Sequence, residues 1–544
     1  MSQYSEKALN SKNKEAIHRI KDILGNDYVL EDDLVLNSYA RTTLSKNVKP
    51  LAVLKPNNND ELRKIIKIAN ETKIGLYPIS KGKNWGYGSA CAVREGQVIV
   101  DLSRMNRIIE VNEQLAYAVI EPGVTQIQLV KYLKDKKVPL WLDCTGSGPE
   151  ASILGNTLER GFGHTPYGDH YLNSCGMQVL LGDGRELNTG FGHYTNSQAT
   201  YTFKYGIGPC LDGLFTQSNY GIVTKMGIWL MPEPEVCNMF YCAVPNDKDL
   251  SKVVEALRPM KLSGQLRSLI HIGNDLRVLS SFNQYPWERA KNQTPLSDDL
   301  RELFCKKGGF GAWNISGAIY GSKAQVRTTK KELKNALKGL GRINFIGDNT
   351  INFLKRCSNL LTKFNLLGEV NTKLKSLDKV YGLLKGKPTD AFLFGTLWRV
   401  KGALKTKSID PLDHNAGMMW LSPILPMTGQ AAAKLIKMVN PVFKRYHFEP
   451  MITVSLITER AMVSVITISY DRDNPSETKR AQECYDVLFK LIMDSGYPPY
   501  RTNIFTMDKL AHGSNVFWDV TKNIKDTLDP NNIISPGRYQ PVEK

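Results

Sequence analysis

The sequence lacks any run that approaches the roughly 18 consecutive apolar residues of a membrane-spanning helix. Residues 1–20 are polar, and they contain neither the apolar core nor the small-residue cleavage site of a secretory signal peptide. The final residues, PVEK, match no targeting signal. These absences predict a cytoplasmic protein with no membrane partner.

Cysteine is scarce and irregularly spaced. The chain has nine cysteines, an odd number, and no CxxC pair. Zinc ribbons and disulfide frameworks need regular spacing, and only Cys237 and Cys242 lie close together. We therefore expect reduced, mostly buried thiols and no metal site.

Acidic residues are outnumbered, 53 against 71 Lys and Arg, which gives a formal net charge of +18. Such an excess can attract nucleic acid, anionic membranes or acidic proteins. The basic residues are spread along the chain, however, and no helix-turn-helix, finger or RRM pattern accompanies them. The densest run, residues 323–338, indicates an exposed helix more than a binding patch. We expect no nucleic-acid partner.

The chain has 544 residues, which is more than one domain with a single hydrophobic core usually contains, so two or three domains are expected. Its N-terminal part, after a first helix and loop, alternates strands and helices. Helical spacing of apolar residues predicts helices at 59–71 and 125–135. Alternating or continuous apolar runs predict strands at 50–54, 74–79, 98–102, 108–111, 116–121, 177–181, 186–187 and 221–230. Residues 140–170 read as a long ordered loop.

Three glycine-centred loops lie in this part of the chain. They are KGKNWGYG at 81–88, the stretch at 146–168, and LFTQSNYGIVTKMGIW at 214–229. Glycine lets backbone approach a phosphate or a flat ligand closely and turn its N–H groups inward. None is a Walker loop or a GxGxxG turn that opens a helix. Three such loops in one α/β domain are more than structure alone requires.

Several segments carry a family resemblance. PISKGKNWGYG, EPGV, LWLD, ILGNTLERGFGHTPYGDH, DGLFTQSNYGIVTKMGIWLMPEPE, YRTNIFTMD and LDPNNIISPGR closely resemble the vanillyl-alcohol-oxidase / p-cresol-methylhydroxylase flavoproteins, the 4-cresol dehydrogenase-like group. The resemblance runs in order from about residue 50 to 540, and it is most specific at 153–170 and 212–234. It implies an enzyme that uses FAD.

The resemblance implies an α+β fold with two lobes. A lead-in at 1–45 would precede an FAD-binding domain of two α/β subdomains at 46–235. An α+β cap at 236–495 would cover the isoalloxazine ring, and residues 496–544 would return to complete the FAD domain. By the same resemblance FAD would contact Lys81, Gly82, Lys83, Asn84, Trp85, Gly86, Gly155, Asn156, Gly161, Gly163, Asp169, Gly221, Ile222, Val223 and Arg538.

The phenol-binding group of the family also has matching positions. Relatives that oxidise para-substituted phenols hold the phenolate with two tyrosines and an arginine, which correspond here to Tyr87, Tyr500 and Arg501. Arginine keeps its proton and donates in a fixed fork, and tyrosine hydroxyls add charge-assisted bonds. The alternative is that Tyr87 packs under the flavin and Arg501 binds a surface carboxylate.

Two departures from the family pattern matter. Phenol-oxidising relatives often carry an Asp in the loop after LWLD, but this loop reads CTGSGPEAS and its one carboxylate is Glu150. If this loop supplies no base, hydration of a quinone methide is less strongly indicated. Direct oxidation of an alcohol or amine, or desaturation, is then the stronger alternative. Met418 stands at the position where oxidases of the family attach FAD to a histidine. The other positions at which relatives attach FAD lack the required Tyr, His and Cys, although His414 and Cys144 lie close to them in the sequence. This predicts non-covalent FAD.

The cap would supply the rest of the substrate pocket. The resemblance places five side chains where cap strands face the ring, although each aromatic could equally be ordinary core packing. These candidates are Phe394, Trp398, Arg399, Trp420 and His447.

The leading hypothesis is an FAD-dependent oxidase or dehydrogenase that oxidises a para-substituted phenol at its benzylic carbon by phenolate-assisted hydride transfer. Electrons would pass to oxygen or to a redox protein, and the family implies a homodimer. A second hypothesis is a tailoring oxidase of a non-phenolic alcohol or lactol with Tyr500 as base. A third is a binding protein with a degenerate flavin fold, which the intact glycine loops disfavour.

Overall fold

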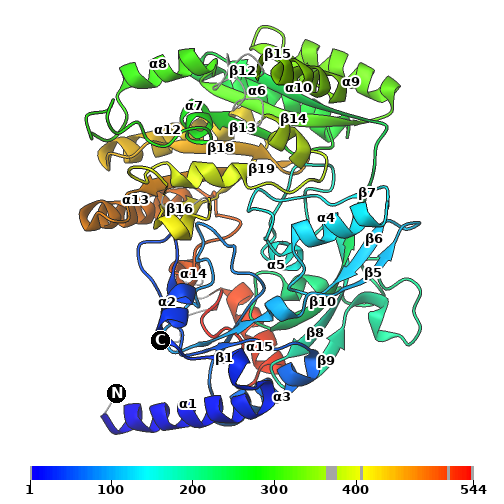
Figure 1. Ribbon diagram of the computed structural model, residues 1–544, viewed down its shortest axis with the longest axis vertical. Helices are drawn as coiled ribbons and strands as arrows, with labels where there is room; N and C mark the ends of the chain where they lie inside the picture. The colour runs from blue at the N-terminus through cyan, green and yellow to red at the C-terminus, as the bar shows by residue number, and fades with distance from the viewer. Residues whose placement is uncertain (1–2, 363–376, 405–407, 511–514, 541–544) are drawn as a thin grey trace.

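The computed structural model describes residues 3–362, 377–404, 408–510 and 515–540. It has two lobes stacked along its long axis (Figure 1). The N-terminal elements form the lower lobe, strands β12 to β19 fill the upper lobe, and the C-terminal helix α15 returns to the lower one. Within the described residues, no helix combines the length and the apolar character needed to cross a bilayer. No cluster of His, Cys, Asp and Glu among them could hold a metal ion.

The first sheet of the lower lobe has the order β1-β2-β4-β3, with β2, β4 and β3 parallel. Helix α3 (Asn59–Thr72) covers it with Leu62, Ile65 and Ile66, on the face that the spacing predicted. The Asn58 side chain caps this helix by accepting from the Glu61 N–H. The strands and the other helices here are β1 (Val29–Leu30), β2 (Val53–Leu54), β3 (Leu76–Ile79), β4 (Val98–Asp101), α1 (Gln3–Leu24) and α2 (Asp33–Ala40).

The second sheet is antiparallel, in the order β5-β6-β10-β8-β9. Its strands are β5 (Ile108–Asn112), β6 (Tyr117–Ile120), β8 (Ser174–Leu181), β9 (Glu186–Asn188) and β10 (Gly221–Trp229), and α4 (Gln126–Asp135) lies nearby. The segment 140–170 is not a continuous loop. It contains β7 (Leu140–Trp141), which pairs with β11 (Met231–Pro232), and the short helix α5 (Ile153–Leu158). Six helical residues are too few for the periodicity to reveal.

The upper lobe is built on an eight-stranded sheet in which β17 pairs with β19 beside the path β15-β12-β14-β13-β18-β19-β16. Its strands are β12 (Val236–Val244), β13 (Ile270–Asn274), β14 (Trp313–Gly321), β15 (Arg342–Ile346), β16 (Gly417–Leu421), β17 (Ile424–Pro426), β18 (Met451–Leu456) and β19 (Ala461–Tyr470). Helices of this lobe are α6 (Leu250–Leu262), α7 (Asp275–Ser280), α8 (Asp298–Gly308), α9 (Lys323–Ala336), α10 (Asp348–Thr362), α12 (Gly429–Arg445) and α13 (Pro475–Asp494).

The two faces of this sheet differ in character. Side chains alternate between faces along each strand. One set, which includes Ile272, Val454 and Ile466, joins a core with helices α6, α12 and α13. The other set, which includes His271 and Ser455, faces the lower lobe and is largely polar. A polar inner face on a buried sheet indicates that it lines a ligand site rather than a dry core.

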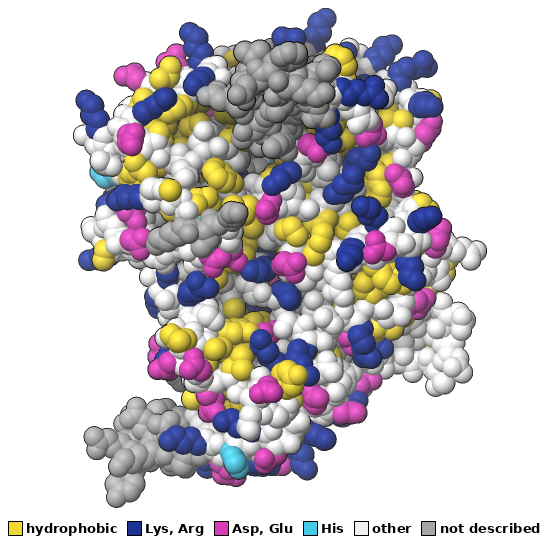
Figure 2. All heavy atoms as spheres, viewed as in Figure 1, with side chains coloured by type: hydrophobic (Ala, Val, Ile, Leu, Met, Phe, Trp, Pro, Cys, Tyr) yellow, Lys and Arg dark blue, Asp and Glu magenta, His cyan; other side chains and the backbone are white. Residues whose placement is uncertain are grey.

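The C-terminal part of the chain packs against both lobes. Helix α14 (Met507–Leu510) packs with the upper core, and α15 (Val516–Leu528) packs on the lower lobe. The buried Lys525 ammonium pairs with Asp529 and donates to the carbonyls of Asn219 and Ile534. The predicted basic helix 323–338 is largely α9, begun by a Ser322–Gln325 capping box. Figure 2 shows Lys and Arg side chains interleaved with Asp and Glu over one face of the molecule.

Candidate active site

A cavity of about 2010 Å³ lies between the two lobes. Ordinary ligand pockets measure about 300–1,000 Å³, so this one has room for a large cofactor and a second molecule. The lower lobe contributes segments near 77–85, 145–162 and 215–223, and the upper lobe contributes the polar sheet face and residues 278–289.

The glycine loop after β3 forms one wall of the cavity. Gly82 has φ +64°, and a Cβ there would lie 2.9 Å from that of Ala90, so only glycine fits. Lys83 pairs with Asp410 at 2.6 Å, which neutralises its charge. Lys81, Asn84 and Trp85 also line the cavity, as do the predicted cofactor residues Gly221, Ile222, Val223 and Arg538. Gly86 does not line it; it lies against the ring of Trp420.

The second glycine loop reaches the cavity through only some of its predicted residues. Gly155, Asn156 and Gly161 line it. Gly163 does not, because its Cα packs against the Asp143 carboxylate and a Cβ would lie 1.4 Å from Oδ1. Asp169 also lies outside, where its carboxylate accepts from the Leu172 N–H at 3.0 Å. Both residues shape the loop behind the wall, and their predicted contact with FAD stays a prediction.

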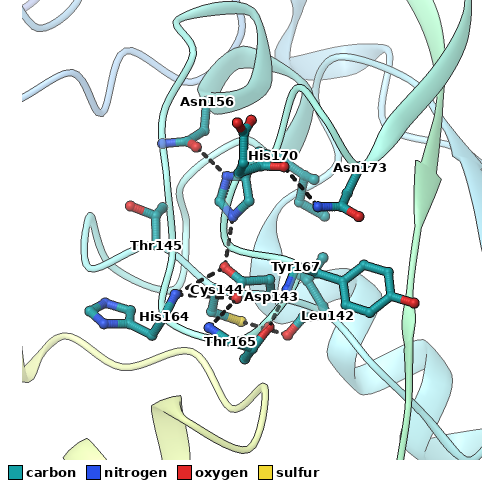
Figure 3. Close-up of polar contacts among 12 residues, drawn as sticks. Leu142, Asp143, Cys144, Thr145, Asn156, His164, Thr165, Tyr167, His170 and Asn173 are labelled. Carbon is teal, nitrogen blue, oxygen red and sulfur yellow. Dashed lines mark hydrogen bonds and ion pairs between the residues drawn. The ribbon is translucent and has the colours of Figure 1, made fainter. Parts of the chain in front are cut away.

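Asp143 organises this loop (Figure 3). Its carboxylate accepts from the backbone N–H groups of His164 at 3.2 Å and Thr165 at 2.6 Å, and it lies 2.8 Å from Nε2 of His170. The other ring nitrogen of His170 lies 2.6 Å from Oδ1 of Asn156. Burial raises the pKa of Asp143, but His170 and Thr165 outweigh it, and the net pKa is lowered. The buried carboxylate thus orients Asn156, a cavity residue, from behind.

The three predicted phenol-binding residues come together at one end of the cavity. The Arg501 guanidinium lies over the Tyr87 ring, 3.8 Å from its centre, and Tyr500 adjoins both. The Tyr87 hydroxyl lies 2.7 Å from Oγ of Ser422. Burial raises the pKa of Tyr87 well above its usual value, so the hydroxyl stays protonated and can donate.

At this end of the cavity, the Glu159 carboxylate pairs with two arginines. Its carboxylate pairs with Arg501 at 3.3 Å and with Arg538, which also donates to the Tyr77 hydroxyl at 3.0 Å. One carboxylate between two guanidiniums leaves a net positive charge. Nε of Arg501 is buried and has no hydrogen-bond partner among the described residues. Glu159 was not predicted, although it stands in the diagnostic segment LERGFGHTPYGDH.

A pair of histidines faces the cavity between the lobes. Nδ1 of His164 lies 3.0 Å from Nε2 of His271, whose other nitrogen lies 2.8 Å from Oγ of Ser455. In Figure 3 the His164 ring points away from Asp143, and it stacks on Phe392 with centres 5.5 Å apart. Burial lowers the pKa of His164 to about 4 and that of His271 well below its usual value. Both rings are neutral at pH 7, and their lowered pKa values make them weak bases. The sequence reasoning missed both.

Three other predicted site residues lie outside the cavity. Glu150 is exposed and does not line the cavity, so its role as a base stays a prediction. His447 is exposed just after the end of α12. Arg399 is 1% exposed and pairs with Glu449 at 2.6 Å and Glu477 at 3.6 Å, which makes it a structural ion pair. The sequence alone gave no sign that Glu449 and Glu477 are the partners of Arg399.

The remaining cap predictions do border the cavity. Phe394 and Trp420 line it, and the Trp420 ring meets Tyr87 edge-on at 5.5 Å. Trp398 also borders it but is fully buried against Tyr285, at 5.3 Å between ring centres.

Of the residues at and near the predicted flavin-attachment positions, Met418, His414 and Cys144 differ in where they lie. Met418 lines the cavity beside Trp85, and a thioether offers no nucleophile for a flavin bond. His414 and Cys144 are buried and lie outside the cavity; Nε2 of His414 is 2.7 Å from the Ser408 carbonyl. Burial raises the pKa of the Cys144 thiol well above its usual value, which makes it unreactive.

Comparisons with known proteins agree with this architecture. Residues 50–190 match the model of an FAD binding domain family. The chain is 35% identical to 1'-carboxy-chondrochloren decarboxylase of Chondromyces crocatus over 96% of both chains. It is 33% identical to the 4-cresol dehydrogenase [hydroxylating] flavoprotein subunit of Pseudomonas putida, over 96% of this chain and 94% of that one.

Two solved structures share the whole fold. p-Cresol methylhydroxylase with substrate bound superposes with a TM-score of 0.87 at 32% identity, covering 98% of this chain and 97% of that one. 4-Ethylphenol oxidase from Gulosibacter chungangensis gives 0.87 at 28% identity, covering 97% of each. Fold and site define an FAD-dependent oxidoreductase. The chain belongs to the vanillyl-alcohol-oxidase / p-cresol-methylhydroxylase family of flavoproteins.

The predicted α+β fold, enzyme class and FAD cofactor are thereby confirmed. The residues present also fit this cofactor. The cavity is large, and its wall is built where a Cβ would clash: at Gly161 it would lie 2.3 Å from Oδ1 of Asn156. Such backbone walls suit a flat ring and a pyrophosphate.

Proposed function

We propose that the enzyme oxidises a para-substituted phenol at its benzylic carbon, by phenolate-assisted hydride transfer to FAD. The observation that carries this proposal is the buried Arg501, whose guanidinium lies over the Tyr87 ring and near Tyr500, and whose Nε has no hydrogen-bond partner in the described part of the chain. A buried donor without a hydrogen-bond partner costs free energy unless a bound ligand accepts its hydrogen bond. Two relatives, the 4-cresol dehydrogenase and the 4-ethylphenol oxidase, are named for para-alkyl phenols, which supports the same substrate class.

In this proposal the trio prepares the substrate for oxidation. Tyr87 and Tyr500 donate hydrogen bonds to the phenol oxygen, and Arg501 lowers the pKa of the bound phenol because an opposite charge favours the ionised form. The phenolate then pushes electron density towards the para carbon. FAD, when bound along the glycine loops, supplies the hydride acceptor. Loss of hydride from the phenolate gives a neutral quinone methide.

The His164–His271 pair, rather than Glu150, serves as the proton acceptor in this proposal. It is neutral, faces the cavity, and can pass a proton between two ring nitrogens 3.0 Å apart. It would take a proton from water that adds to the quinone methide, or from a benzylic hydroxyl. The relatives differ at this point: one is named a hydroxylating dehydrogenase and another a decarboxylase. The final product is therefore a property of the cap and its substrate.

Replacement of Arg501 tests the proposal. Removing a partner from a buried charge costs about 3–5 kcal/mol, which is about two to three and a half decades in rate if it is felt in the transition state. Arg501→Met should be nearly inactive at neutral pH, with activity returning as pH approaches the phenol's own pKa of about 10. Arg501→Lys should fall between, because it keeps the charge and loses the fork. Anaerobic stopped-flow reduction of the flavin measures both.

Equal rates for the Met variant and the parent across pH would contradict phenolate binding. The second hypothesis, oxidation of a non-phenolic alcohol or lactol with Tyr500 as base, would then replace it. Arg267→Met, which removes an exposed arginine outside the cavity, controls for the general effect of removing a positive charge.

A further inference from the structure

Arg277 is a cationic residue of the cavity for which the proposed reaction has no use. It lies in the short helix α7, directly after β13, and lines the cavity from the upper lobe. The Asn274 side chain accepts from its N–H at 3.0 Å and so starts the helix. The stem of Arg277 runs back over Gly273, where a Cβ would lie 3.7 Å from its Cγ.

This arrangement points the arginine along the inner face of the sheet. Gly273 and His271 are two residues apart in β13 and therefore share that face. A Cβ at 273 would be in ordinary van der Waals contact with the Arg277 stem, so the stem packs directly over this residue. Burial and then His164 lower the pKa of His271, and Arg277 lowers it further, so the guanidinium lies near the histidine pair.

The guanidinium of Arg277 has no acidic partner in the described part of the chain. Nη1 donates to Oγ of Ser281 at 2.7 Å, and no carboxylate lies within ion-pair distance. Burial lowers the pKa of Arg277, and no neighbouring acid opposes that effect. The other buried arginines differ: Arg399 has Glu449 and Glu477, and Arg501 shares Glu159 with Arg538.

The acids that line the cavity are already occupied or lie at its rim. Glu159 is committed to two arginines, Asp390 pairs with Lys379 at 2.9 Å, and Glu288 is exposed. None of the three acids that line the cavity therefore pairs with Arg277. A buried cation without a counter-charge is costly, and an anionic ligand removes that cost.

We propose that Arg277 is a carboxylate-binding residue for the substrate. This inference rests on the proposed function and deepens it: the phenolate end meets Arg501, and a carboxylate on the para side chain meets Arg277. A planar guanidinium with donors to spare matches a carboxylate in a bidentate fork. The Ser281 hydroxyl holds Nη1 in place for this contact. The enzyme would prefer phenols that carry an acid over neutral phenols of the same length.

Matched acids and amides test this in the holoenzyme. For binding alone we would use 3-phenylpropanoate and 3-phenylpropanamide, which lack the phenol, and follow the shift in flavin absorbance. For reaction we would use 3-(4-hydroxyphenyl)propanoate and its amide, and follow anaerobic flavin reduction. Hydrogen bonds to charged groups predict that the acid binds about 10- to 100-fold more tightly than the amide.

Variants assign that preference to one side chain. Arg277→Met should abolish the preference for acid over amide, and Arg277→Lys should keep part of it. Arg277→Gln provides a second neutral variant, and the flavin content of each reports whether it folds. Arg267→Met, an exposed arginine outside the cavity, should keep the full preference.

The outcomes separate the two proposals. Equal binding of acid and amide by the parent enzyme, or a preference that survives in Arg277→Met, would overturn the carboxylate site. If neutral phenols reduce the flavin and the acid gains nothing, the site fails while the proposed function stands. If neither phenol reduces the flavin but 3-phenylpropanoate binds in an Arg277-dependent way, the site stands and the phenol reaction fails.

Discussion

Gly163 illustrates how a residue outside the cavity can determine its shape. Sequence reasoning predicts that this glycine faces the flavin, whereas the structure places it against Asp143. The Asp143 carboxylate needs that space to reach the backbone of His164 and Thr165 and the ring of His170. His170 in turn holds the Asn156 side chain. The glycine therefore acts on the cofactor site through three intermediate contacts.

Gly163→Ala should lower stability and cofactor affinity together. The new Cβ would lie 1.4 Å from Asp143 Oδ1, so the carboxylate must move and lose its bonds. Overpacking of this kind costs about 1–3 kcal/mol. Thermal unfolding and titration with FAD measure the two effects. Gly382→Ala is the matched control, because its nearest neighbour is the Lys387 side chain at 3.6 Å. Full stability in Gly163→Ala would show that Asp143 is not fixed as described.

The neutral state of His164 makes stability depend on pH. Its pKa is about 4 in the folded protein and 6.5 as an isolated group, so the unfolded chain binds the proton first. Stability should therefore fall as pH drops from about 6.5 to 4, by up to about 3 kcal/mol for this residue. Asp143, His170 and His271 lie next to it.

His164→Phe should make that decline shallower, because the ring can still stack on Phe392 but cannot bind a proton. Urea unfolding at pH 5 and pH 7 measures the change. His193→Phe replaces an exposed histidine and should leave the pH dependence unaltered. An identical slope in the parent and His164→Phe would mean that folding does not change the pKa of His164.

At the scale of elements, a buried ion pair organises the C-terminal segment, and its lysine also reaches the lower lobe by donating to the Asn219 carbonyl. Lys525 in α15 and Asp529 are 2% and 0% exposed, and Asp529 also accepts from the N–H groups of Ile533 and Ile534. Lys525→Met would leave the carboxylate buried without its partner, at a cost of about 3–5 kcal/mol. Because Arg538 follows on this segment and lines the cavity, FAD affinity should fall as well.

The exposed pair Lys522–Asp526 on the same helix is the control, since surface pairs contribute about 0–1 kcal/mol. Thermal unfolding should therefore separate Lys525→Met from Lys522→Met. Replacing both partners, as in Lys525→Met with Asp529→Leu, should recover part of the loss. A small effect of Lys525→Met alone would mean that Asp529 takes up a proton or reaches water.

Elements with a long periodic pattern were predictable from the sequence. Helix α3 has its apolar residues at helical spacing and an Asn cap, and the buried strand β4 is a continuous apolar run. Helix α5 was missed because it has six residues and depends on the Ser152 cap. The polar inner face of the upper sheet was also missed, since its position depends on which lobe covers it.

The part of the site formed by residues adjacent in the sequence was predictable, and the part formed by residues far apart in the sequence was not. Tyr500 and Arg501 are adjacent and stand in a recognisable motif. His164 and His271 lie 107 positions apart, and their contact exists only after the lobes meet. Arg399 looked like a site residue because its two carboxylate partners come from distant segments. Spacing along the chain carries no information about such pairs.

At the scale of the whole molecule, the cavity lies at the junction of the lobes. Segments from the lower lobe, the upper sheet and the C-terminal segment all line one cavity. A ligand that binds only this assembled state stabilises it by mass action. Met418 stands where the family resemblance expects an attachment histidine, and neither His414 nor Cys144 borders the cavity. We infer that FAD is held without a covalent bond, and two measurements follow from this.

Acid precipitation should leave the yellow colour in the supernatant, with no flavin mass on any peptide. The melting temperature of the protein should also rise with added FAD, because free cofactor at 100 times its Kd contributes about 2.7 kcal/mol. Gly161→Val is the control, since a Cβ there would lie 2.3 Å from Asn156 and should abolish the response. A covalent flavin would give the opposite pair of results: colour in the pellet, and a melting temperature that does not depend on added FAD. Colour in the supernatant without a thermal response would mean that FAD binds one lobe alone, and the cavity would then not need both lobes to hold it.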